Sequence, residues 1–460
     1  MQAGLVRFVG TLADYPARIL FAWYLGLIAA GTLLLLLPAC RDAGTAALSF
    51  TDALFTATSA ASVTGLMVTS LETDLSFMGQ GVVLLLIQLG GLGVMSIGTL
   101  LFVSLTGRQP VRFHVLTRET LGAPLGADVG RLILLVLTVT LALEALGAGV
   151  LLLARLGDGP FTQVLWWAVF HAVSGFCNAG ITLQDASLAP WSGEPAVILT
   201  MAALIVAGGL GFPVLLDILH LSRASPDRRS LRLHTRLVLT ASAILLAGGA
   251  LAIWLVERGG ALESMPAGQA AMNALFQSVT ARSAGFSTVP VQQFAYPSLF
   301  FLLLLMFVGG NSCSTAGGVK VTSVAVLALE GVALARRRWQ TAAFGLRVPE
   351  RVLATAAAVV AVYALVLVIG IMLLLVLEMY DRPHAAAGGH FMDMVFEAVS
   401  ALGTVGLSTG ITGELGEAAR IVLVVMMLLG RVGPLAMVSV LLRSPQGPKI
   451  RYPESEVIVG

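Results

Sequence analysis

Four glycines are the residues of this chain whose type and spacing could support chemistry. The chemical groups would be those of the main chain beside each glycine. Each glycine follows a short stretch that begins with a phenylalanine and is rich in small and hydroxyl side chains; the glycines are Gly65, Gly180, Gly285 and Gly406. The interval from phenylalanine to glycine is ten residues in three copies and nine in the third. Glycine adopts dihedral angles that a side chain resists, and it lets neighbouring strands approach closely. Carbonyl oxygens from four such strands could form rings that replace the water shell of a dehydrated cation.

The residues before each glycine belong to the same candidate strands. The sequence "TVGLS" at 404–408 is similar to the filter strand of tetrameric potassium channels, whereas the other three copies share only the glycine. We call these three-residue segments the glycine strands and predict that they form a K+ selectivity filter; they comprise Val63, Thr64, Gly65, Asn178, Ala179, Gly180, Ser283, Ala284, Gly285, Thr404, Val405 and Gly406. The short helices before them would end near the membrane centre, where their negative dipole ends favour a cation.

A second polar segment, "GGNSCSTAGGVK" at 309–320, interrupts an apolar run. This Gly-rich loop begins 24 residues after Gly285, so that a descending helix would carry it to mid-membrane or below. Polar, irregular backbone at that depth requires a cavity or burial in protein. We predict a mobile gate under the glycine strands, with the residues Gly309, Gly310, Asn311, Ser312, Ser314, Thr315, Gly317 and Gly318. A static glycine kink is the alternative.

Arg431 is the predicted partner of the Gly-rich loop. It lies 25 residues after Gly406, where the second helix of other repeats carries a glycine. A charged side chain inside the membrane is costly unless it is paired or hydrated, so Arg431 should face the pore. Its charge would raise a barrier to a cation, and its guanidinium could hold loop carbonyls closed. A structural arginine bonded to helix-end carbonyls is the alternative.

For the other ionisable residues at membrane depth we expect simpler roles. Lys320 either reaches the cytoplasmic interface or takes part in gating. Arg282 should brace a short helix behind the glycine strands, because a positive charge in the ring would oppose cation passage. Glu144, Asp217 and Glu330 should be satisfied polar residues rather than a proton relay, since their spacing shows no pairing.

The composition indicates an integral membrane protein. Of the 460 residues 57% are hydrophobic and only 11% are charged, a balance that a soluble domain does not accommodate. Hydropathy predicts eight spanning helices, at about 19–37, 78–104, 131–153, 196–220, 236–256, 297–335, 353–377 and 419–442. The three cysteines form neither a disulfide framework nor a zinc-ligand spacing, and no long polar segment could form a catalytic domain.

The spans come in pairs, and each pair encloses one glycine strand. The predicted fold is an all-α integral membrane protein of four covalently linked helix–pore loop–helix repeats with pseudo-fourfold symmetry, as in K+ channels. The repeat boundaries are 1–115, 116–230, 231–345, which contains the Gly-rich loop 309–320, and 346–460. A small-residue signature marks each second helix; it reads "QLGGLGVM", "VAGGLGFP", "FVGGNSCSTAGG" and "LLGRVGPL".

Positive charges alternate along the chain. Nineteen of the 27 Lys and Arg residues lie at the two termini and in the segments 108–131, 223–236 and 336–351. By the positive-inside bias both termini are cytoplasmic, and all four pore loops enter from outside. These basic segments could contact anionic lipid or a cytosolic partner, although an orientation signal is sufficient for each.

The arrangement of four pore-loop repeats with one glycine each resembles the Trk/Ktr/HKT superfamily of potassium transporters across essentially the whole chain. Within it, the eight helices, "GGNSCSTAGG" and "GRVGP" most resemble the KtrB group of membrane subunits. The resemblance implies a homodimer with one pore per protomer in a bacterial inner membrane, regulated by a cytosolic ring of KtrA-like nucleotide-binding subunits. It also implies that the Gly-rich loop is the gate and that four filter glycines favour potassium over sodium.

Potassium uptake is therefore the function that the sequence predicts, with K+ as the transported ion and no organic cofactor or nucleic acid. A sodium-coupled or sodium-permeable cation symporter is the alternative, although a coupled carrier would favour inverted repeats, whereas these run in parallel. An enzyme is not expected, because the chain has no metal-protease motif, Ser–His pairing or carboxylate dyad at depth.

Overall fold

Helices are the main secondary structure of the computed structural model, which describes residues 16–42, 44–106, 129–223, 231–311, 314–381, 383 and 388–433. The helices are α2 (Pro16–Leu35), α3 (Phe50–Ser62), α4 (Phe77–Thr106), α6 (Val129–Ala154), α7 (Phe161–Cys177), α8 (Pro195–Leu210), α9 (Phe212–Arg223), α10 (Leu233–Glu257), α11 (Ala267–Thr280), α12 (Tyr296–Phe307), α13 (Val321–Ala335), α14 (Glu350–Met379), α15 (His390–Gly403) and α16 (Glu417–Val432). A short antiparallel hairpin, β1 (Ala342–Ala343) and β2 (Leu346–Arg347), joins α13 to α14. The predicted all-α class is confirmed.

Three helices of the described residues are long and apolar enough to cross a membrane, and they are Leu134–Ala154, Leu233–Glu257 and Glu350–Met379. A fourth crossing is possible if the bent pair Pro195–Leu210 and Phe212–Leu219 counts as one. Shorter apolar helices lie at Phe21–Leu35, Phe77–Gly93, Phe161–Cys177, Tyr296–Phe307 and Val321–Ala335. The total of eight spans therefore stays a prediction.

Glycines of the small-residue signature interrupt the second helices of the predicted pairs, which hydropathy predicts to be continuous. Gly93 inside α4 has φ 68° and ψ 160°, and Gly211 between α8 and α9 has φ 86° and ψ 147°. Gly433 ends α16 with φ 91° and ψ 129°. Such angles are accessible almost only to glycine. The span expected at 196–220 is accordingly two helices bent by 100°, because its third signature glycine permits that turn.

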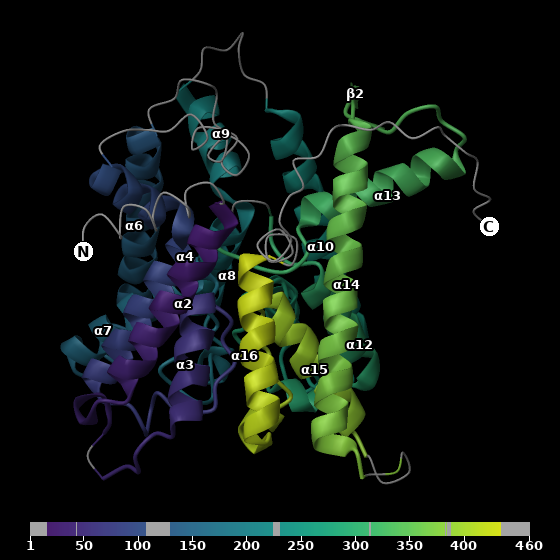
Figure 1. Ribbon diagram of the computed structural model, residues 1–460. Helices are drawn as coiled ribbons and strands as arrows, with labels where there is room; N and C mark the ends of the chain where they lie inside the picture. The colour runs from purple at the N-terminus through teal and green to yellow at the C-terminus, as the bar shows by residue number, and fades with distance from the viewer. Residues whose placement is uncertain are drawn as a thin grey trace.

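Helices of successive predicted repeats are in contact, and the last repeat also contacts the first. Figure 1 shows α6 and α7 at one side of the molecule and α13 and α14 at the other. Each short helix that leads into a glycine strand contacts the second helix of the preceding predicted repeat: α7 contacts α4, α11 contacts α8, and α15 contacts α12. The short helix of the first repeat, α3, contacts α16 of the fourth. This order agrees with the pseudo-fourfold arrangement, which stays a prediction, as do the four repeat boundaries.

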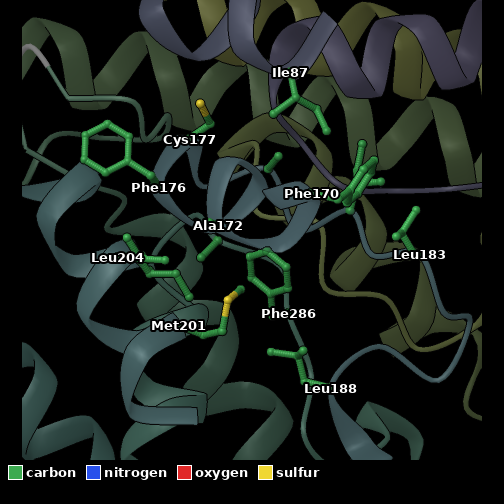
Figure 2. Packing of buried hydrophobic residues seen from close by; sticks show 14 of the residues in the cluster. Ile87, Phe170, Ala172, Phe176, Cys177, Leu183, Leu188, Met201, Leu204 and Phe286 are labelled. Atoms are coloured by element: carbon green, nitrogen blue, oxygen red, sulfur yellow. The ribbon is translucent and has the colours of Figure 1, made fainter. Parts of the chain in front are cut away.

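Aromatic and aliphatic side chains anchor the short helices. The phenylalanine that begins each copy of the repeat is completely buried; the four are Phe55, Phe170, Phe276 and Phe396. Figure 2 shows Phe286, which follows Gly285, with its ring beside Ala172 of α7 and Met201 of α8. Phe286, in the chain that follows the third glycine strand, thus packs against helices of the second predicted repeat and holds the two adjacent strands together.

Candidate functional site

The short helices lead into the glycine strands through the same left-handed turn. The residue two positions before each glycine has a positive φ, with values of 56° at Val63, 60° at Asn178, 68° at Ser283 and 46° at Thr404. Positive φ is rare for a residue with a side chain, and for a β-branched residue such as Val63 or Thr404 it is a genuine outlier. The surrounding structure must hold these angles, and strain of this kind clusters at functional sites.

The four glycines meet at one place, as the sequence predicts. All have positive φ, with 98° at Gly65, 67° at Gly180, 80° at Gly285 and 91° at Gly406. A Cβ on Gly65 would lie 2.6 Å from the carbonyl oxygen of Ala179 and 3.2 Å from the Cα atoms of Gly180 and Gly406. The same approach to the carbonyl oxygen before the next glycine repeats from Gly180 to Ala284, from Gly285 to Val405 and from Gly406 to Thr64. The contacts follow chain order and close into a ring.

Hydroxyl groups of the short helices support the ring. The backbone N–H groups of Gly65 and Gly406 donate to Ser59 Oγ and Ser400 Oγ, each at 3.0 Å. In the other two copies the hydroxyl donates to the carbonyl oxygen after the glycine, from Ser174 to Ile181 at 2.6 Å and from Thr280 to Phe286 at 2.7 Å. Sequence reasoning missed these residues, although the hydroxyls recur at six, six, five and six residues before the glycines.

A buried carboxylate supports the fourth strand from behind. Glu397 of α15 is completely buried, and its Oε2 accepts a hydrogen bond from Thr412 Oγ1 at 3.0 Å. Its other oxygen accepts from the hydroxyl of Ser408, two residues past Gly406. Sequence reasoning missed Glu397 as well, and the signal was a lone carboxylate in the apolar stretch "VFEAVSALG".

A cavity of about 600 Å³ opens on one side of the ring. All four glycines line it, together with the segments that follow them in the chain. Asp185 contributes a carboxylate to its wall, where Ser70 Oγ donates to both carboxylate oxygens at 2.8 and 2.9 Å. A negative charge in a concave mouth raises the local concentration of cations.

The Gly-rich loop lies against the last turn of α8. The Asn311 N–H donates to the Gly209 carbonyl oxygen at 3.1 Å, and the Thr315 N–H donates to Gly208 at 3.3 Å. Asn311 and Thr315 are 1% and 2% exposed, so polar loop residues are buried in protein. Ser312 lies outside the described residues, and so does Cys313.

The two glycine pairs of the loop fold onto each other. The Gly310 N–H donates to the Gly317 carbonyl oxygen at 3.3 Å, and a Cβ on Gly318, which has φ 71°, would lie 3.0 Å from the Cα of Gly309. Ser314 Oγ donates to the Asn311 carbonyl oxygen at 2.7 Å. The described part of the loop is therefore a compact turn.

Arg431 joins this loop to two other helices. Its Nε donates to the Tyr24 hydroxyl at 2.9 Å, and its Nη2 donates to the Gly90 carbonyl oxygen at 2.5 Å. Its Nη1 donates to the carbonyl oxygen of Thr315 in the loop. Both expected kinds of partner are present, a loop carbonyl and a helix carbonyl; the sequence did not suggest Tyr24.

The remaining ionisable residues lie outside the ring. Lys320 Nζ donates to the Ala316 carbonyl oxygen at 2.7 Å, and Arg282, which is 8% exposed, donates to Ser242 Oγ of α10 at 3.4 Å. Glu144 accepts from Gln88 Nε2 at 3.2 Å, and Asp217 accepts from Thr235 Oγ1 at 2.7 Å. Glu144 and Asp217 each have a polar partner.

Known proteins share this architecture. A family model described as "TrkH: Cation transport protein" matches residues 24–452. The Ktr system potassium uptake protein B of Vibrio alginolyticus is 34% identical over 445 residues, which cover 96% of this chain and 94% of that protein. The potassium/sodium uptake protein NtpJ of Enterococcus hirae is 33% identical over 448 residues, with 97% of each chain covered. The crystal structure of the potassium transporter TrkH from Vibrio parahaemolyticus has the same fold, with a TM-score of 0.73 at 22% identity over 92% of this chain and 83% of that one.

Proposed function

Because this chain belongs to the TrkH family of cation transport proteins, we propose that it mediates potassium uptake through its four glycine strands. The resemblance read from the sequence is confirmed, and the chain is a transporter rather than an enzyme. Potassium is its transported substrate and moves down its electrochemical gradient. The named function of the Vibrio alginolyticus relative supports this choice of ion.

The ring of glycines and carbonyl oxygens is the observation that carries the proposal. Each glycine lies against the carbonyl oxygen that precedes the next glycine, and the last contact returns to the first strand. Rings of backbone carbonyls can replace the hydration shell of K+. The cavity of about 600 Å³ beside the ring gives ions access to these strands.

We propose further that the Gly-rich loop is the gate and that Arg431 holds it closed. The support is the position of Thr315, which is buried against α8 while its carbonyl oxygen accepts from Arg431. Residues 309–311 and 314–318 together with Arg431 would form the barrier. Loss of these contacts would free the loop to move.

The assembly follows from the resemblance. We propose a homodimer in a bacterial plasma membrane, with both termini in the cytoplasm and a KtrA-like nucleotide-binding ring as the regulator. The name of the Vibrio alginolyticus relative, a protein of a "Ktr system", supports a partner subunit. The basic segments at 223–236 and 336–351 supply positive charge on the cytoplasmic side.

A sodium-permeable or sodium-coupled transporter is the second candidate. The Enterococcus hirae relative is named a potassium/sodium uptake protein. Asn178 and Ala179 of the second strand also depart from the "TVG" pattern of the fourth.

Uptake of radioactive rubidium into liposomes that contain the purified full-length chain tests the function. We expect uptake that follows the potassium gradient, saturates with external K+ and proceeds without sodium. A strict requirement for an inward sodium gradient would favour the symporter. Liposomes that take up no alkali cation above protein-free controls would contradict both candidates.

A further inference from the structure

The hydroxyl of Ser283 lies between two glycine strands and the Gly-rich loop. Ser283 is 1% exposed and occupies the left-handed position of the third strand. Its Oγ donates to the carbonyl oxygen of Thr404 in the fourth strand at 2.7 Å, and it accepts from the Gly317 N–H of the loop at 2.9 Å. A hydroxyl has one donor and free acceptor lone pairs, so both bonds form at once.

Asn178 makes a second link of this kind from the second strand. With its amide oriented so that both polar atoms have partners, its oxygen accepts from the Thr315 hydroxyl at 3.1 Å. Its nitrogen then donates to the carbonyl oxygens of Ile205 and Gly175 at 3.1 and 3.2 Å. The loop therefore touches two left-handed residues on different strands.

The loop also approaches the left-handed residue of the fourth strand. A Cβ on Gly317 would overlap Thr404 Oγ1 and lie 3.1 Å from the Gly403 carbonyl oxygen. Left-handed residues with side chains persist only where their surroundings hold them. Movement of the loop must therefore remove support from Asn178, Ser283 and Thr404, three of the four residues that lead into the ring.

We propose that Ser283 is a positioning residue that couples cation occupancy of the glycine strands to docking of the Gly-rich loop. A cation held by the carbonyl oxygens fixes the strands in the geometry in which Ser283 Oγ accepts from Gly317. An empty ring relaxes and weakens that bond. By thermodynamic linkage, the docked loop favours the occupied ring to the same degree. This coupling rests on the proposed function and adds to it a regulation of the same site.

Hydrogen–deuterium exchange of residues 314–319 in the full-length protein tests the coupling. We expect exchange in wild-type protein to be about 3- to 10-fold slower in potassium chloride than in choline chloride, the range for one hydrogen bond. In Ser283→Ala, exchange should be fast in both salts. Ser283→Thr should restore the difference, because Thr404 occupies the equivalent left-handed position.

Ser298→Ala is the matched control. Ser298 of α12 is also 1% exposed, and its hydroxyl has no partner among the described residues. This variant loses an equally buried hydroxyl and should keep the cation-dependent exchange. Thermal stabilisation by K+, measured on every variant, reports potassium binding separately from the loop.

The outcomes separate the coupling from the transport function. Equal exchange in the two salts, with K+ still stabilising wild-type protein, would overturn the coupling and leave the transport function standing. Retained cation dependence in Ser283→Ala would overturn it as well. If K+ neither stabilises nor crosses liposomes, the proposed function fails and the coupling fails with it.

Discussion

Gly65 has φ 98°, and a Cβ at this position would meet the backbone of two other glycine strands, at Ala179 and Gly180 of the second and at Gly406 of the fourth. A substituent there must displace main chain, which cannot yield like the end of a flexible side chain. We expect Gly65→Ser to distort the ring and to lower the potassium-to-sodium permeability ratio by about 5- to 150-fold, the range that corresponds to backbone strain of about 1–3 kcal/mol. Paired rubidium and sodium uptake in liposomes measures the ratio.

Gly248→Ser provides the comparison for this substitution. Gly248 lies in α10, and a Cβ there would meet no atom within 4 Å. This variant should retain the wild-type ratio. A folded Gly65→Ser protein with an unchanged ratio would remove Gly65 from the ion path.

Glu397 illustrates a residue that acts from behind the strand. Its carboxylate accepts from the hydroxyls of both Ser408 and Thr412, whereas a glutamine has a single acceptor oxygen. We expect Glu397→Gln to lower the free energy of unfolding by about 1–3 kcal/mol, the cost of leaving a buried hydrogen-bonding group without its partner. Potassium uptake should fall several-fold, because the fourth strand loses a fixed contact. Thermal unfolding and rubidium uptake are the two measurements.

Misfolding is not expected of this variant, because the third copy has a buried glutamine at the corresponding position: Gln277 directly follows Phe276, as Glu397 directly follows Phe396. Glu414→Gln makes the same chemical change at an exposed carboxylate and should alter neither property. Wild-type stability in Glu397→Gln would show that the two hydrogen bonds of this carboxyl group do not hold the strand.

The short helices and the Gly-rich loop were the most predictable elements. The residue types of the short helices repeat four times along the chain, so their spacing located the glycines, whereas the loop at 309–320 occurs once and was located because it interrupts an apolar run. The left-handed angles of Val63 and Thr404 were not predictable, since β-branched residues avoid them and only tertiary contacts impose them. The break at Gly211 was missed because hydropathy reports how apolar a segment is and not its direction.

Arg431 connects separate elements, because its guanidinium joins α16 to the Gly-rich loop and to α4. Arg431→Ala removes the donors to Thr315 and Gly90. We expect uptake in the absence of any regulator to rise by about 10- to 150-fold, since a hydrogen bond from a charged donor contributes about 1.5–3 kcal/mol to the closed loop. Initial rates of rubidium uptake measure this effect.

Arg420→Ala is the control on the same helix. Arg420 pairs with Asp52 at 2.6 Å and has no bond to the loop among the described residues. Its loss should leave the unregulated rate unchanged. A wild-type rate in Arg431→Ala would exclude this residue from gating and favour a purely structural arginine.

At the scale of the whole molecule, the ring closes through contacts between segments far apart in the sequence. The return from α16 to α3 and the approach of Gly406 to Thr64 complete the order. Sequence periodicity suggests four equivalent units but does not determine how the last meets the first. Contacts between repeats provide such information: Phe286 of the third repeat is buried among residues of α7 and α8 of the second.

The cavity lined by all four glycines opens in front of the ring, so charge on its wall should affect ions that arrive through it. We expect Asp185→Asn to reduce potassium uptake about two- to tenfold at 10 mM ionic strength, where electrostatic interactions extend about 30 Å. The difference should disappear near 1 M choline chloride, where they extend about 3 Å. Asp158→Asn removes the same charge from the connection before α7, outside the residues that line the cavity, and should have no such effect. A deficit in Asp185→Asn that persists at high salt would mean that Asp185 acts through its bonds to Ser70 and not through its charge.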